Sequence, residues 1–251
     1  MDLGAAMVDG FVPQSVTVSS RYEGDKVIED QAWEDASDDV LASAVPWRTF
    51  RWYMGQKHYS GTYWSATMQD HVIYESRLEL SRLLLADFDP TVRHIVAQPF
   101  LLRAEVGGRR ARKHIPDYLL LTGSGPVVVD VKPTQHLAKP EVDFTFRWTR
   151  YAVEQRGWRY EVWSEPPVVY LENVRFLAGY RRQWLFDPGL LDALKTSGLA
   201  GLTIAEAARA LPDHAEPMVR AAVLHLLWSG VIKVDLDRPL GTVPISKVAA
   251  R

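Results

Sequence analysis

The pattern of apolar and polar residues predicts two short strands near the middle of the chain. Residues 118–121 are a continuous apolar run that follows Asp117. Residues 123–125, Gly-Ser-Gly, predict a turn, since glycine tolerates positive φ and serine bonds locally. Residues 127–129 are three valines, which favour a strand and lead into Asp130. Each predicted strand therefore carries one acidic residue.

Helices and further strands are predicted on both sides of this pair. Apolar residues recur at helical spacing over residues 70–86, and Pro90 ends that pattern. Residues 92–106 predict one strand or two, broken at residues 98–99, before a Gly-Gly hairpin turn at 107–108. A helix is predicted over 140–157 and a strand over 158–163. This order predicts an α/β fold, a mixed sheet flanked by helices.

The composition changes after residue 182, and short helices are predicted at 185–194, 203–211 and 217–229. Thr203 and Glu206 have the spacing of a capping box. A short strand is predicted at 231–235, and three helices followed by a strand are the order of a winged helix. Residues 1–44 have an acidic stretch and no sustained period, which predicts a flexible segment. We therefore expect three parts: 1–44, a domain at 45–183 and a smaller one at 184–251.

Composition excludes several classes of protein. The 251 residues carry a net charge of −2, so a DNA-binding surface would have to be local. Cysteine is absent, which excludes disulfides and thiolate sites, and the seven histidines lack zinc-site spacing. No apolar run approaches the ~18 residues of a membrane span, and the N-terminus lacks the pattern of a secretory signal. A cytoplasmic protein that does not associate with membranes is expected.

The two predicted strands carry residues suited to phosphate chemistry. Asp130 and Lys132 should point to one face of the second strand while Val131 points into the core. A buried charged pair is costly unless it binds something. Carboxylates bind Mg²⁺, and a lysine can contact the phosphate or orient a water. Pro116-Asp117 followed 13 positions later by Asp130-Val131-Lys132 matches the PD-(D/E)xK nuclease pattern.

Neighbouring residues could complete such a site. Glu75 and Glu79 are four positions apart on the predicted helix, so either could supply a third carboxylate. The alternative is an ordinary surface helix in which Arg82 pairs with Glu79. Residues 47–53 are rich in arginine and aromatic side chains, which either stack on bases or belong to half-buried strands. Four cations could contact a DNA backbone, or serve only solubility at a hairpin tip: Arg109, Arg110, Arg112 and Lys113.

The chain resembles the TnsA-type endonuclease subunit of heteromeric transposases. The resemblance spans about 45–182 and is carried by Val45-Pro46-Trp47, Tyr74 to Glu79, Gln98-Pro99-Phe100, Pro116-Asp117-Tyr118-Leu119 and Asp130-Val131-Lys132-Pro133. It implies a restriction-endonuclease-like fold followed by a winged-helix-type domain. It also implies the catalytic residues Glu79, Asp117, Asp130 and Lys132, with Glu79, Asp117 and Asp130 as metal ligands and Glu75 as an alternative. The family usually has Gln or Glu where this chain has Asp130.

The resemblance further implies Mg²⁺-dependent cleavage of the non-transferred strand at transposon ends, with Mn²⁺ able to replace Mg²⁺. The implied partners are double-stranded DNA and a DDE-type transposase, with an AAA+ regulator as a further candidate. Two other hypotheses stay open on the sequence: a stand-alone restriction or repair nuclease, and a non-catalytic DNA-binding or assembly module.

Overall fold

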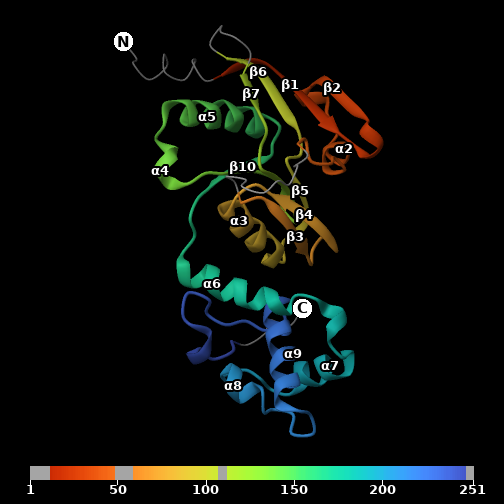
Figure 1. Ribbon diagram of the computed structural model, residues 1–251, viewed down its shortest axis with the longest axis vertical. Helices are drawn as coiled ribbons and strands as arrows, with labels where there is room; N and C mark the ends of the chain where they lie inside the picture. The colour runs from red at the N-terminus through yellow and green to blue at the C-terminus, as the bar shows by residue number, and fades with distance from the viewer. Residues whose placement is uncertain (1–11, 49–58, 107–111, 247–251) are drawn as a thin grey trace. The chain divides into compact units, whose positions relative to one another are not determined.

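The computed structural model describes residues 12–48, 59–106 and 112–246 (Figure 1). It is a mixed α/β protein that divides into two compact units. Unit 1 comprises Met1–Ala86 and Thr91–Glu165, and unit 2 comprises Asp87–Pro90 and Pro166–Arg251. The division at residue 165 comes earlier than the expected boundary at 183, because helix α6 (Val168–Leu177) packs on α9 (Glu216–Trp228) of unit 2.

A four-stranded sheet in the order β10-β9-β8-β5 contains the predicted strand pair. Strands β8 (Tyr118–Thr122) and β9 (Gly125–Val131) are antiparallel, as predicted, and Gly125 has a φ of 107° at the turn. Strand β5 (Val92–Ala97) lies antiparallel to β8. Helices α4 (Thr134–Leu137) and α5 (Pro140–Gln155) connect β9 to the parallel strand β10 (Arg159–Trp163). The predicted helix at 140–157 and strand at 158–163 are confirmed.

The two faces of this sheet bury different side chains. Tyr118, Leu120, Val127, Val129 and Val131 belong to one buried cluster, which includes Leu83 and Ala86 of helix α3 (Arg77–Phe88). The alternate residues Leu119 and Val128 belong to a second cluster with Trp148, Ala152 and Val153 of α5. The period of two in these strands therefore places one helix on each face.

A second four-stranded sheet has the order β2-β1-β6-β7. It consists of β1 (Pro13–Arg21), β2 (Val27–Ala32), β6 (Leu101–Val106) and β7 (Arg112–His114). Strands β5 and β6 confirm the predicted break at residues 98–99. The Gly-Gly turn between β6 and β7 lies outside the described residues.

The prediction of a flexible segment at residues 1–44 is wrong for its described part. Strand β1 pairs with β6, a strand about 85 positions later in the chain, over Pro13 to Ser19. Trp33 is buried and donates Nε1 to the carbonyl oxygen of Ala152 at 2.8 Å. Leu41, in α2 (Asp38–Ala42), is fully buried. The acidic side chains stay on the surface while the apolar ones between them enter the core.

The helix predicted at 70–86 is wrong in its first part. Asp70–Tyr74 is strand β4, paired in a hairpin with β3 (Gly61–Ser65), and the helix begins only at Arg77. Glu75 therefore precedes the helix and does not share a helical face with Glu79. A local apolar pattern does not reveal a strand partner, and that partner decided the outcome here.

Unit 2 is largely helical. It contains α6, α7 (Pro188–Thr196), α8 (Ile204–Ala207) and α9. The capping box of Thr203 and Glu206 is confirmed. The strand predicted at 231–235 is reduced to an isolated antiparallel bridge between Lys233 and Ser246. The described residues also contain 3-10 turns, at Glu23–Asp25, Trp33–Asp35, Ala178–Tyr180, Gln183–Leu185 and Leu240–Thr242. None of the helices in the described part of the chain combines the length and the apolar character of a membrane span.

Candidate active site

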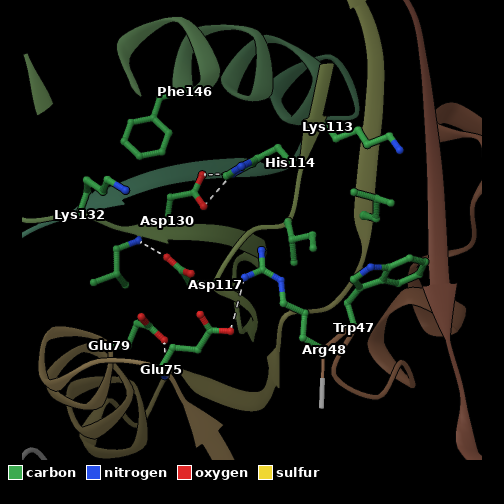
Figure 2. Close-up of a pocket in the computed structure, with 13 residues that line it drawn as sticks. Trp47, Arg48, Glu75, Glu79, Lys113, His114, Asp117, Asp130, Lys132 and Phe146 are labelled. Carbon is green, nitrogen blue, oxygen red and sulfur yellow. Dashed lines mark hydrogen bonds and ion pairs between the residues drawn. The ribbon is translucent and has the colours of Figure 1, made fainter. Parts of the chain in front are cut away.

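A cavity of about 580 Å³ in unit 1 gathers most of the residues singled out from the sequence (Figure 2). Its acidic side chains come from the segment before α3, from α3, from the start of β8 and from β9. Its basic side chains come from β7, from the end of β9 and from the segment before residue 49. These charged lining residues are Glu75, Glu79, Asp117, Asp130, Arg48, Lys113, His114 and Lys132.

Asp117 is fixed by its backbone as well as by its side chain. Its backbone nitrogen donates to the carbonyl of Val129 at 3.1 Å, and its carbonyl accepts from the backbone nitrogen of Gln98 at 2.8 Å. Its Oδ2 accepts from the backbone nitrogen of Val131 at 2.6 Å. These bonds hold one carboxylate oxygen against the end of β9. Figure 2 shows Asp117 between Asp130 and Glu79.

Gln98 stands at the corner between β5 and β6 and links three parts of the site. Its φ of 46° is uncommon for a residue with a side chain, and its side chain is buried. Its Nε2 donates to Glu75 Oε1 at 2.5 Å, and its Oε1 accepts from the backbone nitrogen of Arg48 at 3.1 Å. The strained corner therefore holds Glu75 and the Arg48 segment beside Asp117.

The two candidate glutamates differ in their partners. Glu75 Oε1 lies 3.6 Å from Arg48 Nη1 in addition to its bond from Gln98. Glu79, in the first turn of α3, accepts from the backbone nitrogen of Glu75 through Oε2 at 2.7 Å. Figure 2 shows both carboxylates on the same side of the pocket. Glu75 is thus partly neutralised by a cation, whereas Glu79 is held by a neutral donor.

The alternative in which Arg82 pairs with Glu79 is wrong. Arg82 instead binds Glu161 of β10 with two hydrogen bonds, from Nε at 3.0 Å and from Nη2 at 2.9 Å. Only 12% of the Arg82 side chain is exposed. This pair anchors α3 to the sheet and leaves the Glu79 carboxylate for the pocket.

Asp130 is the most enclosed of the four acids, with 2% of its side chain exposed. Both of its oxygens accept from His114 Nε2, at 2.9 and 2.8 Å, and Oδ2 also accepts a short bond from the Tyr160 hydroxyl. The expectation that Asp130 shares a face of its strand with Lys132 is consistent with Figure 2, where both lie on the α5 side of β9. Val131 is buried on the other face, as predicted.

The cations at the pocket are less constrained. In the described part of the chain, the Lys132 ammonium makes no hydrogen bond or ion pair, although its backbone nitrogen donates to the carbonyl of Trp163 at 2.8 Å. Lys113 lines the pocket, whereas the exposed Arg112 lies over the ring of Phe144 at 5.0 Å. Arg109 and Arg110 lie outside the described residues, as does most of the segment 47–53. Trp47 and Arg48, at its start, line the pocket.

The pKa values of Asp117 and Glu79 are both raised. Burial is the main cause that raises the pKa of Asp117 well above its usual range, and the charges of Asp130 and Glu79 add to it. Asp117 is surrounded largely by protein but keeps part of its surface open to solvent. Burial also raises the pKa of Glu79, while bonds from Glu75 and Ser76 lower it. Such concentrated negative charge is relieved by a proton or by a cation.

The donor set fits a hard divalent cation only in part. Asp117 and Glu79 each have one carboxylate oxygen without a hydrogen bond from the described residues, and oxygen donors are the ligands such cations prefer. Asp130 has both oxygens engaged. Within residues 12–48, 59–106 and 112–246, no three Asp, Glu or His side chains are arranged as a metal site.

Sequence reasoning did not identify three of these residues. Gln98 stands inside the quoted Gln98-Pro99-Phe100 motif and His114 lies two positions before Pro116, so these positions were a usable signal. Tyr160 lies 30 positions after Asp130, and nothing in the sequence connects the two.

Comparison with known proteins adds no assignment. Neither the protein-family models nor the curated proteins include a match to this chain.

Proposed function

We propose that this chain is a metal-dependent DNA endonuclease of the TnsA type, with a restriction-endonuclease-like unit 1. The observation that carries the proposal is the meeting of Glu79, Asp117 and Lys132 in one pocket. They come from a helix, from the start of one strand and from the end of its neighbour. Two carboxylates that can hold a divalent cation, together with a lysine that can contact the phosphate, are suited to hydrolysis of a phosphodiester.

Asp117 and Glu79 are the carboxylates best suited to hold Mg²⁺ or Mn²⁺. Their raised pKa values reflect burial first and repulsion from neighbouring carboxylates second, and a bound cation would offset both. When bound, the metal would supply charge neutralisation at the phosphate and a more acidic water. Glu75 is the weaker candidate because Arg48 and Gln98 already occupy its carboxylate.

Lys132 is suited to the substrate side of the reaction. Its ammonium has no partner among the described residues, so it is available to contact a phosphate oxygen or to orient the attacking water. Water adds to phosphorus, one P–O bond breaks, and the leaving oxygen takes up a proton.

The family resemblance extends the proposal to cleavage of the non-transferred strand at transposon ends. The partners would be double-stranded DNA, a DDE-type transposase and an AAA+ regulator. The order of α7, α8 and α9 followed by the bridge at Lys233 supports a winged-helix-type unit 2, suited to partner binding. The net charge of −2 agrees with DNA affinity supplied in part by a partner.

The proposal is tested by nicking of supercoiled plasmid DNA carrying candidate transposon ends, with Mg²⁺ or Mn²⁺. The full chain is assayed alone and with the transposase encoded beside its gene. Asp117→Asn and Lys132→Met should lower the nicking rate by roughly 100-fold or more, equivalent to about 3 kcal/mol. Asp143→Asn and Lys139→Met, which change exposed side chains on or next to α5, are the matched controls.

Each outcome separates the hypotheses. Nicking only with the transposase supports the transposon-end endonuclease, and sequence-specific cutting by the chain alone supports a stand-alone nuclease. No metal-dependent nicking in either arrangement would leave only the non-catalytic module. Equal nicking rates in wild type and both variants would show that Asp117 and Lys132 are not the catalytic residues.

A further inference from the structure

Asp130, His114 and Tyr160 form a buried hydrogen-bonded network at the pocket. His114 is in β7 and Asp130 is in β9, so their contact joins the two four-stranded sheets of unit 1. The Tyr160 hydroxyl, from β10, donates to the same carboxylate. Three strands from two sheets therefore meet at one carboxylate.

The partners of Asp130 leave it no free oxygen. Its side chain is 2% exposed, and His114 Nε2 lies 2.9 and 2.8 Å from its two oxygens. A cation at Asp130 would therefore have to share an oxygen that already accepts a hydrogen bond from His114 or Tyr160. Both are packed in place, since 16% of the His114 side chain is exposed and Tyr160 is buried.

The His114 ring is fixed from two further sides. Phe146 and Trp148 each stand edge-on to it, with ring centroids 6.3 Å away. Its second nitrogen, Nδ1, makes no hydrogen bond within the described residues and is not among the fully buried polar atoms. A carboxylate on one ring nitrogen sets the orientation of the imidazole, and the other nitrogen is left for a substrate.

We propose that Asp130 is a positioning residue for His114 and not a metal ligand, and that His114 contacts the phosphodiester at this pocket. This inference rests on the proposed function. It leaves Glu79 and Asp117 as the carboxylates that take the cation. It also gives a reason for aspartate at this position: the shorter side chain keeps the carboxylate close to its own strand, within reach of β7 and β10.

Metal binding distinguishes a positioning residue from a ligand. Mn²⁺ is titrated calorimetrically into the metal-free full chain and into Asp117→Asn, Asp130→Asn and the control Asp143→Asn. We expect Asp117→Asn to weaken affinity by roughly 100-fold, because a ligand is lost. Asp130→Asn should weaken it by less than about tenfold, because only attraction through space is lost. Equal losses in the two variants would overturn the inference.

The ring nitrogens of His114 provide a second readout that needs no metal. In protein labelled with ¹⁵N-histidine, the His114 signal is identified by its absence in His114→Gln. We expect a low-field Nε2 proton in wild type that is lost in Asp130→Asn and displaced in Tyr160→Phe. An unchanged His114 signal in Asp130→Asn would contradict positioning, whatever the metal titration shows.

The substrate contact is tested on the same signals. A short double-stranded DNA, added at low salt with Ca²⁺, should shift the His114 ring signals in wild type and leave those of the exposed His214 unmoved. Unmoved His114 signals at saturating DNA would overturn the contact. If wild type binds no Mn²⁺, the proposed function fails, and the spectra still decide whether Asp130 positions His114.

Discussion

At the scale of single residues, Asp117 is the pocket carboxylate whose ionised form is most disfavoured. It lies between Asp130 and Glu79, and both charges raise its pKa in addition to burial. One bond from the Val131 backbone opposes them without removing the effect. A folded protein that keeps such a group at neutral pH is less stable than it would be with a neutral side chain, so the arrangement points to a ligand.

The pH dependence of stability tests this cost. Between the usual aspartate pKa near 4 and the raised pKa of Asp117, the folded state binds a proton that the unfolded chain has lost. The unfolding free energy of the metal-free protein should therefore fall as pH rises through that interval. Asp117→Asn lacks this loss, so its melting temperature in EDTA at pH 7 should exceed that of wild type by roughly 2–4 °C, equivalent to about 1 kcal/mol.

Calorimetric melting curves at pH 4 and pH 7 measure the difference. The gain should be much smaller at pH 4, where the wild-type carboxyl is protonated in the folded state and about half protonated in the unfolded chain. Asp143→Asn, on the exposed part of α5, should show no such gain at pH 7. An Asp117→Asn variant that melts below wild type at both pH values would contradict the argument.

At the scale of elements, the position of Glu79 depends on how α3 is anchored. The helix follows directly on the β3-β4 hairpin and lies on the sheet through Leu83 and Ala86. Arg82 of α3 also forms an ion pair with Glu161 of β10. The two side chains are 12% and 34% exposed, respectively. Two parallel hydrogen bonds between a guanidinium and a carboxylate fix orientation as well as distance.

A double-mutant cycle measures this anchor. Arg82→Met and Glu161→Gln, singly and together, should give a coupling of about 1–2 kcal/mol in the free energy of unfolding. The exposed pair of Arg147 and Asp143, four positions apart on α5, is the matched control and should give about 0.3–0.5 kcal/mol. Equal coupling in the two pairs would show that burial adds nothing to the anchor.

At the scale of the whole molecule, charge is distributed unevenly. The chain has 31 acidic and 29 basic residues, yet residues 109–113 contain four cations. Arg109 and Arg110 precede β7 in the sequence, and Arg112 and Lys113 belong to it. The last residue of β7, His114, lines the pocket. On the proposed function, this local basic cluster would supply DNA affinity to a nearly neutral protein through few contacts.

Removing this cluster should lower DNA affinity in a salt-dependent way. A variant with Arg109, Arg110, Arg112 and Lys113 changed to alanine should bind duplex DNA more weakly. Its plot of log affinity against log salt should lose up to about 3.6 units of slope, at about 0.9 per phosphate contact. Fluorescence anisotropy over 50–200 mM salt measures both quantities.

The control removes the same charge from unit 2. Four exposed cations are changed together to alanine: Arg175, Arg209, Arg220 and Lys233. If both variants lose the same slope, DNA responds to net charge, and the 109–113 cluster is not a binding surface.

The sequence by itself determined the elements whose partners are close along the chain. The β8-β9 hairpin follows from an apolar run, a Gly-Ser-Gly turn and a valine run, and only Gly125 needs a positive φ. Helix α5, strand β10 and the Thr203 capping box were predicted for the same reason: periodicity and capping are local properties. Asp117 and Lys132 were named from motif spacing and Glu79 from the family resemblance, and all three line one pocket.

Tertiary structure decided whatever depends on distant partners. Strand β1 forms because β6 offers an edge about 85 positions later, and Asp70–Tyr74 is a strand because Gly61–Ser65 pairs with it. Arg82 could reach Glu79 along a helix, but Glu161 provides a bidentate partner on the sheet. Asp130 looked like a ligand on its strand, and the network with His114 and Tyr160 exists only once two sheets meet. Spacing along the chain predicts which side chains could form a site. The tertiary structure decides which of these side chains bind one another and which stay available to a ligand.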